Sequence, residues 1–178
     1  NQFIKNSVLL IVAALVGLIV SSVAQIFMIA AKNIFAFIFN NKDFVYTIEI
    51  GTVSLNLLPL LICLPCSILV ALLMYYLKLP RWFGPADTIF AAHHRAGNLD
   101  LKGGFGSTLA SFISVSGGAS VGVYGPLVHF GGTVSAFIRR LSFIPKIPHD
   151  IIIGCGVASA ISAGFGAPLA GIIFAHET

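Results

Sequence analysis

Charged side chains are scarce in this sequence. Only 9% of its 178 residues are charged, whereas a soluble domain carries about a quarter. No basic run alternates with aromatic residues, as it does in proteins that bind nucleic acid. Together with a mean hydropathy of +0.99, this composition indicates a multi-pass integral membrane protein that is surrounded by lipid and has no nucleic-acid partner.

Cysteine is also rare, and familiar catalytic motifs are missing. Three cysteines do not make a disulfide framework. Cys63 and Cys66 have the spacing of a redox or metal pair, but no second ligand pair follows them, so two packed thiols are the favoured interpretation. Cys155 is interpreted as core packing. Because metalloprotease, serine-hydrolase and phosphate-loop motifs are all absent, we expect no enzyme activity, no metal and no cofactor.

Long apolar runs, in contrast, are abundant. Ser7–Ala31 and Gly51–Leu79 are each long enough to cross the hydrocarbon core of about 30 Å as a helix. Pro59 and Pro65 predict a kink or a break in the second span. Residues 33–50 are predicted to be a connection whose aromatic side chains anchor it at the membrane interface. Residues 79–102 form the most basic connection, and the positive-inside rule predicts that it is cytoplasmic.

Glycine, serine and proline interrupt the later apolar segments. Residues 103–121 are rich in small side chains, which let membrane helices pack closely. Pro126 is predicted to open a helix that ends at Arg139 and Arg140, with residues 122–125 as its non-helical lead-in. Residues 164–168 divide the last apolar region, 151–176, into two short helices. Short, interrupted helices are typical of transporters and channels that bind their substrate near mid-membrane.

The helix start at Pro126 predicts an anion site. Unpaired N–H groups and the helix dipole favour an anion there, and the glycines that precede it let an anion approach the backbone. Irregular backbone inside a membrane survives only where protein or a water-filled cavity covers it. His129 lies one turn further on and could line such a path, although a packed, hydrogen-bonded histidine is the favoured interpretation.

Three segments resemble motifs of the CLC family of chloride channels and chloride/proton antiporters. Residues 122–132, GVYGPLVHFGG, resemble its G-[KR]-E-G-P motif, and residues 166–174, GAPLAGIIF, resemble its N-A-P-L-A-G-[IL]-[IL]-F segment. Residues 83–87, FGPAD, are more loosely similar to its G-S-G-I-P-E motif. The resemblance implies an all-α polytopic membrane fold, with tilted, broken helices and half-helices that end near mid-membrane.

The resemblance covers only about the first half of a subunit of that family. It implies that residues 1–178 are the first of two inverted repeats, with the anion path between the repeats. The second repeat is absent from this chain, so the sequence is either a fragment or one of two chains. The family further implies a homodimer in which each subunit has its own pore, and we expect it in a bacterial inner or plasma membrane.

Specific positions follow from the same resemblance. Backbone groups of two segments would bind the anion, and their residues are Gly84, Pro85, Ala86, Gly122, Val123, Tyr124, Gly125 and Pro126. Tyr124 stands where the family has its gating glutamate, and Thr178 stands at the inner proton-carrying glutamate. Val123 replaces a basic residue. Neither Phe83 nor Gly84 supplies the hydroxyl of the family's serine.

These replacements predict passive, channel-like conduction of chloride or another small anion rather than antiport. A neutral tyrosine, with an ordinary pKa near 10, cannot compete with chloride or carry protons as a carboxylate does. Its hydroxyl could donate to an anion, or its ring could plug the path. Two alternatives stay open, namely a transport-inactive structural or regulatory subunit of the same fold and a membrane redox protein that uses Cys63 and Cys66.

Overall fold

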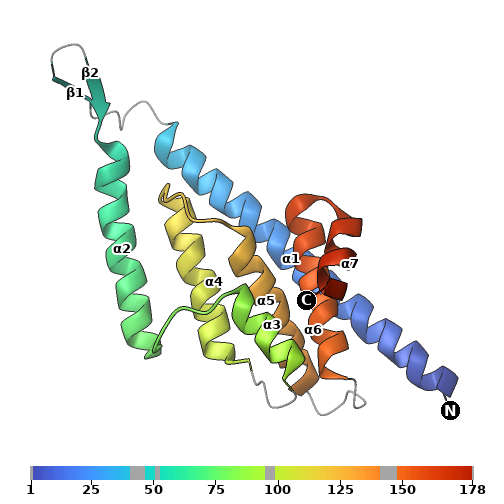
Figure 1. The fold of residues 1–178 in the computed structure, drawn as a ribbon. Helices are drawn as coiled ribbons and strands as arrows, with labels where there is room; N and C mark the ends of the chain where they lie inside the picture. Colours follow the sequence, from blue (N-terminus) through green and yellow to red (C-terminus); the bar gives the residue numbers. More distant parts are fainter. Residues whose placement is uncertain (1, 41–46, 51–52, 95–98, 141–147, 178) are drawn as a thin grey trace.

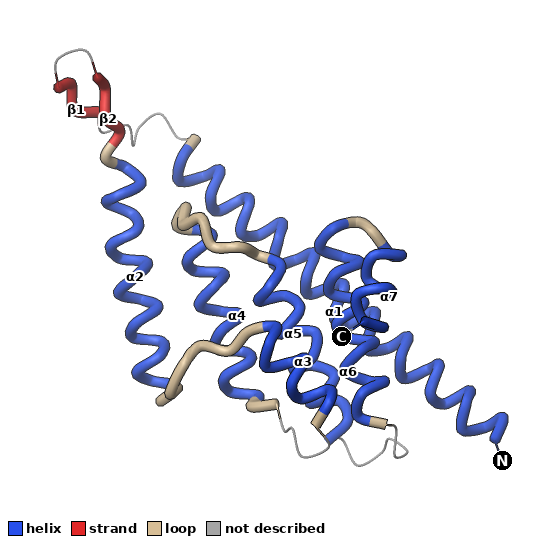
Figure 2. Tube along the Cα trace, viewed as in Figure 1, coloured by secondary structure: helices blue, strands red, loops and turns tan. Residues whose placement is uncertain are grey.

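The computed structural model describes residues 2–40, 47–50, 53–94, 99–140 and 148–177. Within these ranges it contains helices and one short β-hairpin (Figure 1). The elements are α1 (Gln2–Phe39), β1 (Thr47–Ile50), β2 (Val53–Asn56), α2 (Leu58–Leu77), α3 (Pro85–His93), α4 (Leu101–Ser116), α5 (Tyr124–Arg140), α6 (His149–Phe165) and α7 (Pro168–Glu177). Figure 2 shows that the hairpin projects beyond the helices, at the N-terminal end of α2.

Among the described residues, two helices are long and apolar enough to cross a membrane, residues Asn6–Phe39 of α1 and the whole of α2. At about 1.5 Å per residue, the 38 residues of α1 are longer than the hydrocarbon core is thick. α1 includes the aromatic stretch that was predicted to be a connection, and residues 18–39 contain neither glycine nor proline to end the helix. Phe35 and Phe39 stack on each other with ring centroids 4.6 Å apart.

The second span begins at Leu58 rather than at Gly51, because β1 and β2 use residues before it. The strands pair antiparallel, with Thr47 opposite Asn56, and their β-branched residues favour this conformation. The hairpin is an addition to the all-α fold that was predicted. α2 then runs through Pro65 without the predicted break. Pro59 lies in the first turn of α2, where its missing N–H costs no helical hydrogen bond.

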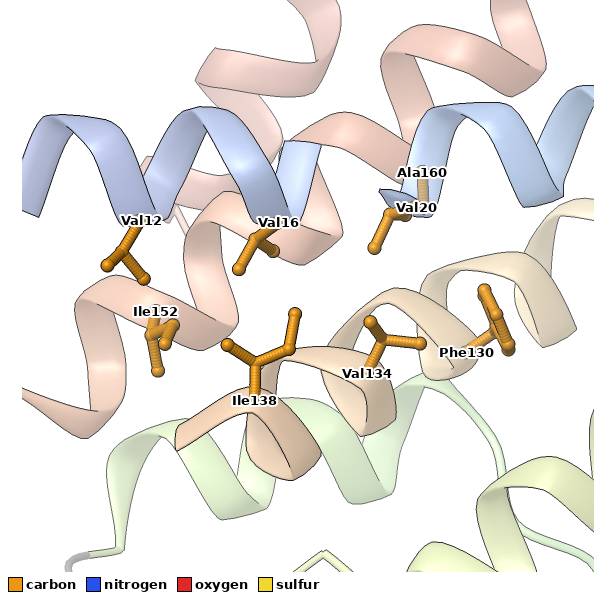
Figure 3. Close-up of a cluster of buried hydrophobic side chains, with 8 residues drawn as sticks. All are labelled: Val12, Val16, Val20, Phe130, Val134, Ile138, Ile152 and Ala160. Carbon is orange, nitrogen blue, oxygen red and sulfur yellow. The ribbon is translucent and has the colours of Figure 1, made fainter. Parts of the chain in front are cut away.

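α1, α5 and α6 share the main hydrophobic cluster (Figure 3). Its members are Val12, Val16 and Val20 from α1, Phe130, Val134 and Ile138 from α5, and Ile152 and Ala160 from α6. On α1 and α5 the spacing is four residues, so each helix presents a ridge to the groove of its neighbour. Other apolar side chains of α1 point away from the protein, since Leu18 and Ile26 are 65% and 64% exposed.

Small residues let the helix backbones approach one another, as the sequence predicted. α5 and α6 meet at Gly131 and Gly156, where a Cβ on either residue would overlap the backbone of the other. α4 meets α5 where Gly104 faces the side chain of Thr133. Glycine and serine therefore set the spacing of the helices that carry the central motif.

The last apolar region is divided as predicted. α6 ends at Gly166, which has a φ of 64°, and α7 begins at Pro168. Within the polar connection at 79–102 the structure adds α3, a helix that the sequence analysis missed. Arg95, one of the basic residues that predict a cytoplasmic location, lies outside the described residues.

Candidate anion-binding site

The first turns of α3 and α5 lie side by side. A Cβ built on Gly125, in the first turn of α5, would lie 3.5 Å from Cγ of Pro85, the first residue of α3. Further along both helices, Gly132 packs against Thr88, and the Thr88 hydroxyl lies 2.7 Å from Nδ1 of His129. Because the contacts advance in the same direction along both helices, α3 and α5 are parallel, and both run downward in Figure 1.

Parallel packing places two positive helix ends together. Each helix start carries about half a positive charge on N–H groups that have no acceptor within the helix. Two such ends side by side repel each other unless negative charge lies in front of them. The arrangement of Gly84 and Tyr124, at the two helix starts, therefore favours an anion or a carboxylate between them.

The chain supplies one carboxylate itself. Gly84 N–H donates to Oδ2 of Asp87 at 2.8 Å, and the Asp87 carboxylate forms an ion pair with the Arg81 guanidinium. Pro85 has no N–H to offer. An anion at the predicted backbone site of residues 84–86 therefore has to compete with Asp87 for the Gly84 amide.

A hydroxyl also lies beside this segment, although the motif itself contains none. Ser107 of α4 is buried, and its Oγ accepts a hydrogen bond from Phe83 N–H at 2.9 Å. The prediction that no hydroxyl is available was made from the motif alone, and here the hydroxyl comes from another helix.

α5 begins at Tyr124, two residues before the predicted start at Pro126. The N–H of Leu127 donates to the carbonyl of Val123 at 3.4 Å. Proline is tolerated throughout a first turn, because the N–H groups there have no helical acceptor. The amides of Tyr124 and Gly125 thus belong to the first turn. The lead-in is open, since a Cβ on Gly122 would meet no atom within 4 Å.

The ring of Tyr124 is held against the end of α6. It stacks on Phe165 with centroids 3.8 Å apart and planes 16° apart. Gly164 makes room for it, because a Cβ there would lie 3.0 Å from Cδ1 of the tyrosine. The side chain at the predicted gating position is therefore held by an aromatic contact.

His129 is fully buried between α5 and α3. Its ring lies parallel to that of Phe83, with 6.1 Å between centroids, and its Nδ1 is hydrogen-bonded to Thr88. Its Nε2 is buried and has no hydrogen-bond partner among the described residues. The favoured prediction of a packed, hydrogen-bonded histidine therefore holds for Nδ1, whereas Nε2 is packed but has no described hydrogen-bond partner.

A cleft of about 1110 Å³ opens between α3, α5, α6 and α7. Its basic lining residues are His93, Arg139, His149 and His176, and Asp150 is acidic. Thr88 and Val128 also line it, so the cleft reaches the neighbours of His129. Arg139 and His149 contact each other at 2.9 Å. The cleft is therefore lined more by basic than by acidic groups.

The structure brings the two predicted backbone segments together, residues 84–86 and 122–126. Thr178, the predicted inner proton position, lies outside the described residues. Sequence reasoning missed the roles of Arg81, Asp87 and Thr88. The order Gly84-Pro85-Ala86-Asp87 does carry a signal for α3, since an acidic side chain three residues after a cap position bonds the cap amide.

The cysteines are free thiols and act as packing groups. Sγ of Cys63 lies 3.9 Å from the carbonyl of Gly117, and Cys66 faces the same glycine. These contacts join α2 to the end of α4. The described residues contain no cluster of histidine, cysteine or acidic side chains that could hold a metal ion.

Comparisons with known proteins agree with the motifs. The sequence model of the family described as "Voltage gated chloride channel" matches residues 66–178. A ClcB-like chloride channel protein of Ralstonia nicotianae is 31% identical over 110 residues, which cover 59% of this chain and 25% of that protein. A voltage-gated ClC-type chloride channel ClcB of Escherichia coli is 32% identical over 82 residues, covering 46% of this chain and 19% of the relative.

A third relative, Chloride channel protein C of Dictyostelium discoideum, is 30% identical over 93 residues, or 44% of this chain and 12% of that protein. The matched parts thus span a quarter or less of these relatives. The family match covers both helix starts and the α6–α7 break. The chain therefore belongs to the voltage-gated chloride channel family of integral membrane proteins, as the resemblance predicted.

Proposed function

We propose that the full-length protein conducts chloride or a similar small anion passively across a membrane. The observation that carries this proposal is the parallel packing of α3 and α5 at Gly125 and Pro85. Two converging helix starts offer partial positive charge and backbone N–H groups, which replace part of the hydration shell of an anion. The names of the relatives, which are chloride channels, support chloride as the first anion to test.

Passive conduction is favoured over antiport because of the side chain at Tyr124. A proton-coupled mechanism needs a group that gains and loses protons at ordinary pH, and tyrosine stays neutral there. The stacking on Phe165 holds the ring against α6. The predicted inner position, Thr178, also lacks a carboxyl group.

The cleft between α3, α5, α6 and α7 fits the role of an anion entrance. Its charged lining residues are one arginine and one aspartate, Arg139 and Asp150, beside three histidines, so an anion that enters it meets no excess of negative charge. We further propose that the remaining part of each subunit supplies the second repeat and covers this cleft. The functional unit is then a homodimer in a bacterial inner or plasma membrane.

One observation favours the alternative of a transport-inactive subunit. Asp87 already bonds the Gly84 amide, and a carboxylate that stays there permanently would exclude chloride from the start of α3. The two functions differ in a direct measurement, namely chloride efflux from liposomes that contain the full-length protein, with the external pH followed in the same sample.

Efflux without proton movement is the expected result. Efflux with protons moving in the opposite direction would contradict the passive mechanism. If the folded protein releases neither chloride nor nitrate, the inactive subunit replaces the proposed function.

A further inference from the structure

We propose that His129 donates a hydrogen bond from Nε2–H to the anion at the start of α3. This inference rests on the proposed function, and it assigns a side-chain ligand in addition to the backbone groups. The starting point is that the imidazole is fully buried, with Nδ1 bonded to Thr88 and Nε2 bonded to no described residue.

The position of the ring directs Nε2 toward the helix starts. Side chains of a helix lean toward its N-terminus, so His129 lies over the first turn of α5. On α3 the ring bonds Thr88 through Nδ1, and it also approaches the backbone of Gly84 and the charge of the Asp87 carboxylate, although Nε2 completes a hydrogen bond with no described residue. The free ring nitrogen therefore faces the first turn of α3, where the Gly84 amide is bonded to Asp87.

The surroundings determine which nitrogen carries the proton. A lone pair on Nε2 would face the negative charge of Asp87, whereas an N–H would be attracted to it. Thr88 can supply its hydroxyl hydrogen to Nδ1, which leaves the ring proton on Nε2. A buried donor without an acceptor is rare in folded proteins, and a bound anion would supply the acceptor.

Charge balance permits an anion at this place. Arg81 neutralises Asp87 through their ion pair, so the pair does not repel chloride as a single carboxylate would. The remaining local charge is the positive end of α3, to which the anion would be bound. The Phe83 ring lies parallel to the imidazole, with 6.1 Å between centroids, and the imidazole is fully buried.

The test compares two substitutions at His129 with a matched control. His129→Gln keeps an N–H donor near the place of Nε2, whereas His129→Leu keeps the volume and removes the donor. Ser116→Ala is the control, because Ser116 Oγ is the other buried polar side-chain atom that has no partner among the described residues. Chloride binding to each full-length protein is measured by calorimetry in detergent, with gluconate as the inert anion.

We expect His129→Leu to weaken chloride binding about tenfold or more, as the loss of a hydrogen bond to a charged group does. His129→Gln is expected to stay within about threefold of the native protein, and Ser116→Ala is expected to bind like it. Equal chloride binding by the native protein and His129→Leu would overturn this inference and leave the proposed function intact. Absence of chloride binding by the native protein would overturn both.

A second measurement does not depend on the folding of a variant. In native protein with ¹⁵N-labelled histidine, the Nε2 resonance of His129 should show an attached proton and should shift when chloride replaces gluconate. A bare Nε2, or a resonance that chloride does not move, would contradict the inference.

Discussion

Tyr124 occupies the most informative position at the scale of single residues. Its amide belongs to the first turn of α5, where the proposed anion binds, while its ring stacks on Phe165. The backbone and the side chain of Tyr124 therefore have different roles. The backbone offers an N–H, and the ring occupies space beside the helix start without adding charge.

Replacement of Tyr124 by alanine is expected to raise anion flux, because it removes the ring from the mouth of the site and keeps the amide. It should also lower stability by about 1 kcal/mol, since an aromatic pair contributes about that much. Chloride efflux and thermal unfolding in detergent measure the two effects. Tyr75→Ala is the control, as Tyr75 is 78% exposed on α2. Unchanged efflux would contradict a plugging role for the ring.

Tyr124→Glu is expected to make conduction depend on pH. Above a carboxyl pKa of about 4.3 the side chain is negative and competes with chloride for the positive helix start, so flux is low. As the pH falls through that pKa the carboxyl becomes neutral, and flux rises. Efflux at a series of pH values measures this, and a flat profile would argue that residue 124 does not face the anion path.

At the scale of elements, the decisive feature is the parallel packing of α3 and α5. Two helix starts side by side are electrostatically unfavourable alone and favourable with an anion. The small residues at 125 and 132 permit this contact, since larger side chains would press on Pro85 and Thr88. The anion that would stabilise the two helix starts is the same ion that the proposed function moves across the membrane.

Asp87→Asn is expected to strengthen chloride binding about tenfold, because it removes a negative charge near the site and leaves Arg81 without its partner. The amide oxygen can still accept from Gly84 N–H, so the start of α3 is retained. Asp100→Asn is the matched control, as Asp100 caps α4 and accepts from Lys102 N–H at 3.1 Å. Equal affinity in the Asp87 variant would place the bound anion away from α3.

The contact between α5 and α6 depends on glycine. Gly156→Ala is expected to destabilise the protein by about 1–3 kcal/mol, the usual cost of overpacking, because its Cβ would overlap Gly131 and Ser135. Gly154→Ala, in the same helix, meets only an ordinary contact at 3.8 Å and should be neutral or slightly stabilising. Thermal unfolding in detergent compares them, and equal losses would argue against close α5–α6 packing.

At the scale of the whole molecule, the helices run between two ends. The β-hairpin and the start of α2 lie at one end, and the ends of α3 and α5 lie at the other (Figure 1). Side chains that are exposed between these ends, such as Leu18, Ile26 and Leu69, are apolar and suit contact with lipid. The positive-inside prediction assigns the end with α3 to the cytoplasm.

This orientation is testable by chemical labelling. In a variant without the native cysteines, Asn56→Cys and His94→Cys would each add one exposed thiol, at opposite ends of the molecule. A membrane-impermeant maleimide added to right-side-out vesicles is expected to label residue 56 and to leave residue 94 unlabelled until the vesicles are opened. The reverse pattern would show that the cytoplasmic assignment is wrong.

Local sequence determined the family and the ends of the later helices. Gly166 and Pro168 specify the break between α6 and α7, because each restricts its own backbone without help from distant residues. Apolar length determined α1 and α2 in the same way. The hairpin at 47–56 was missed because β1 was assigned to the predicted connection at 33–50 and β2 to the start of the second predicted span.

Tertiary structure alone decided which of these parts meet. Thr88 and His129 are far apart in the chain, and only the parallel packing of α3 and α5 joins them and leaves Nε2 without a described partner. Likewise, the stacking of Tyr124 on Phe165 depends on where α6 ends. Backbone conformation is a property of neighbouring residues, whereas the location of charge and hydrogen-bond donors around an anion depends on how the helices pack.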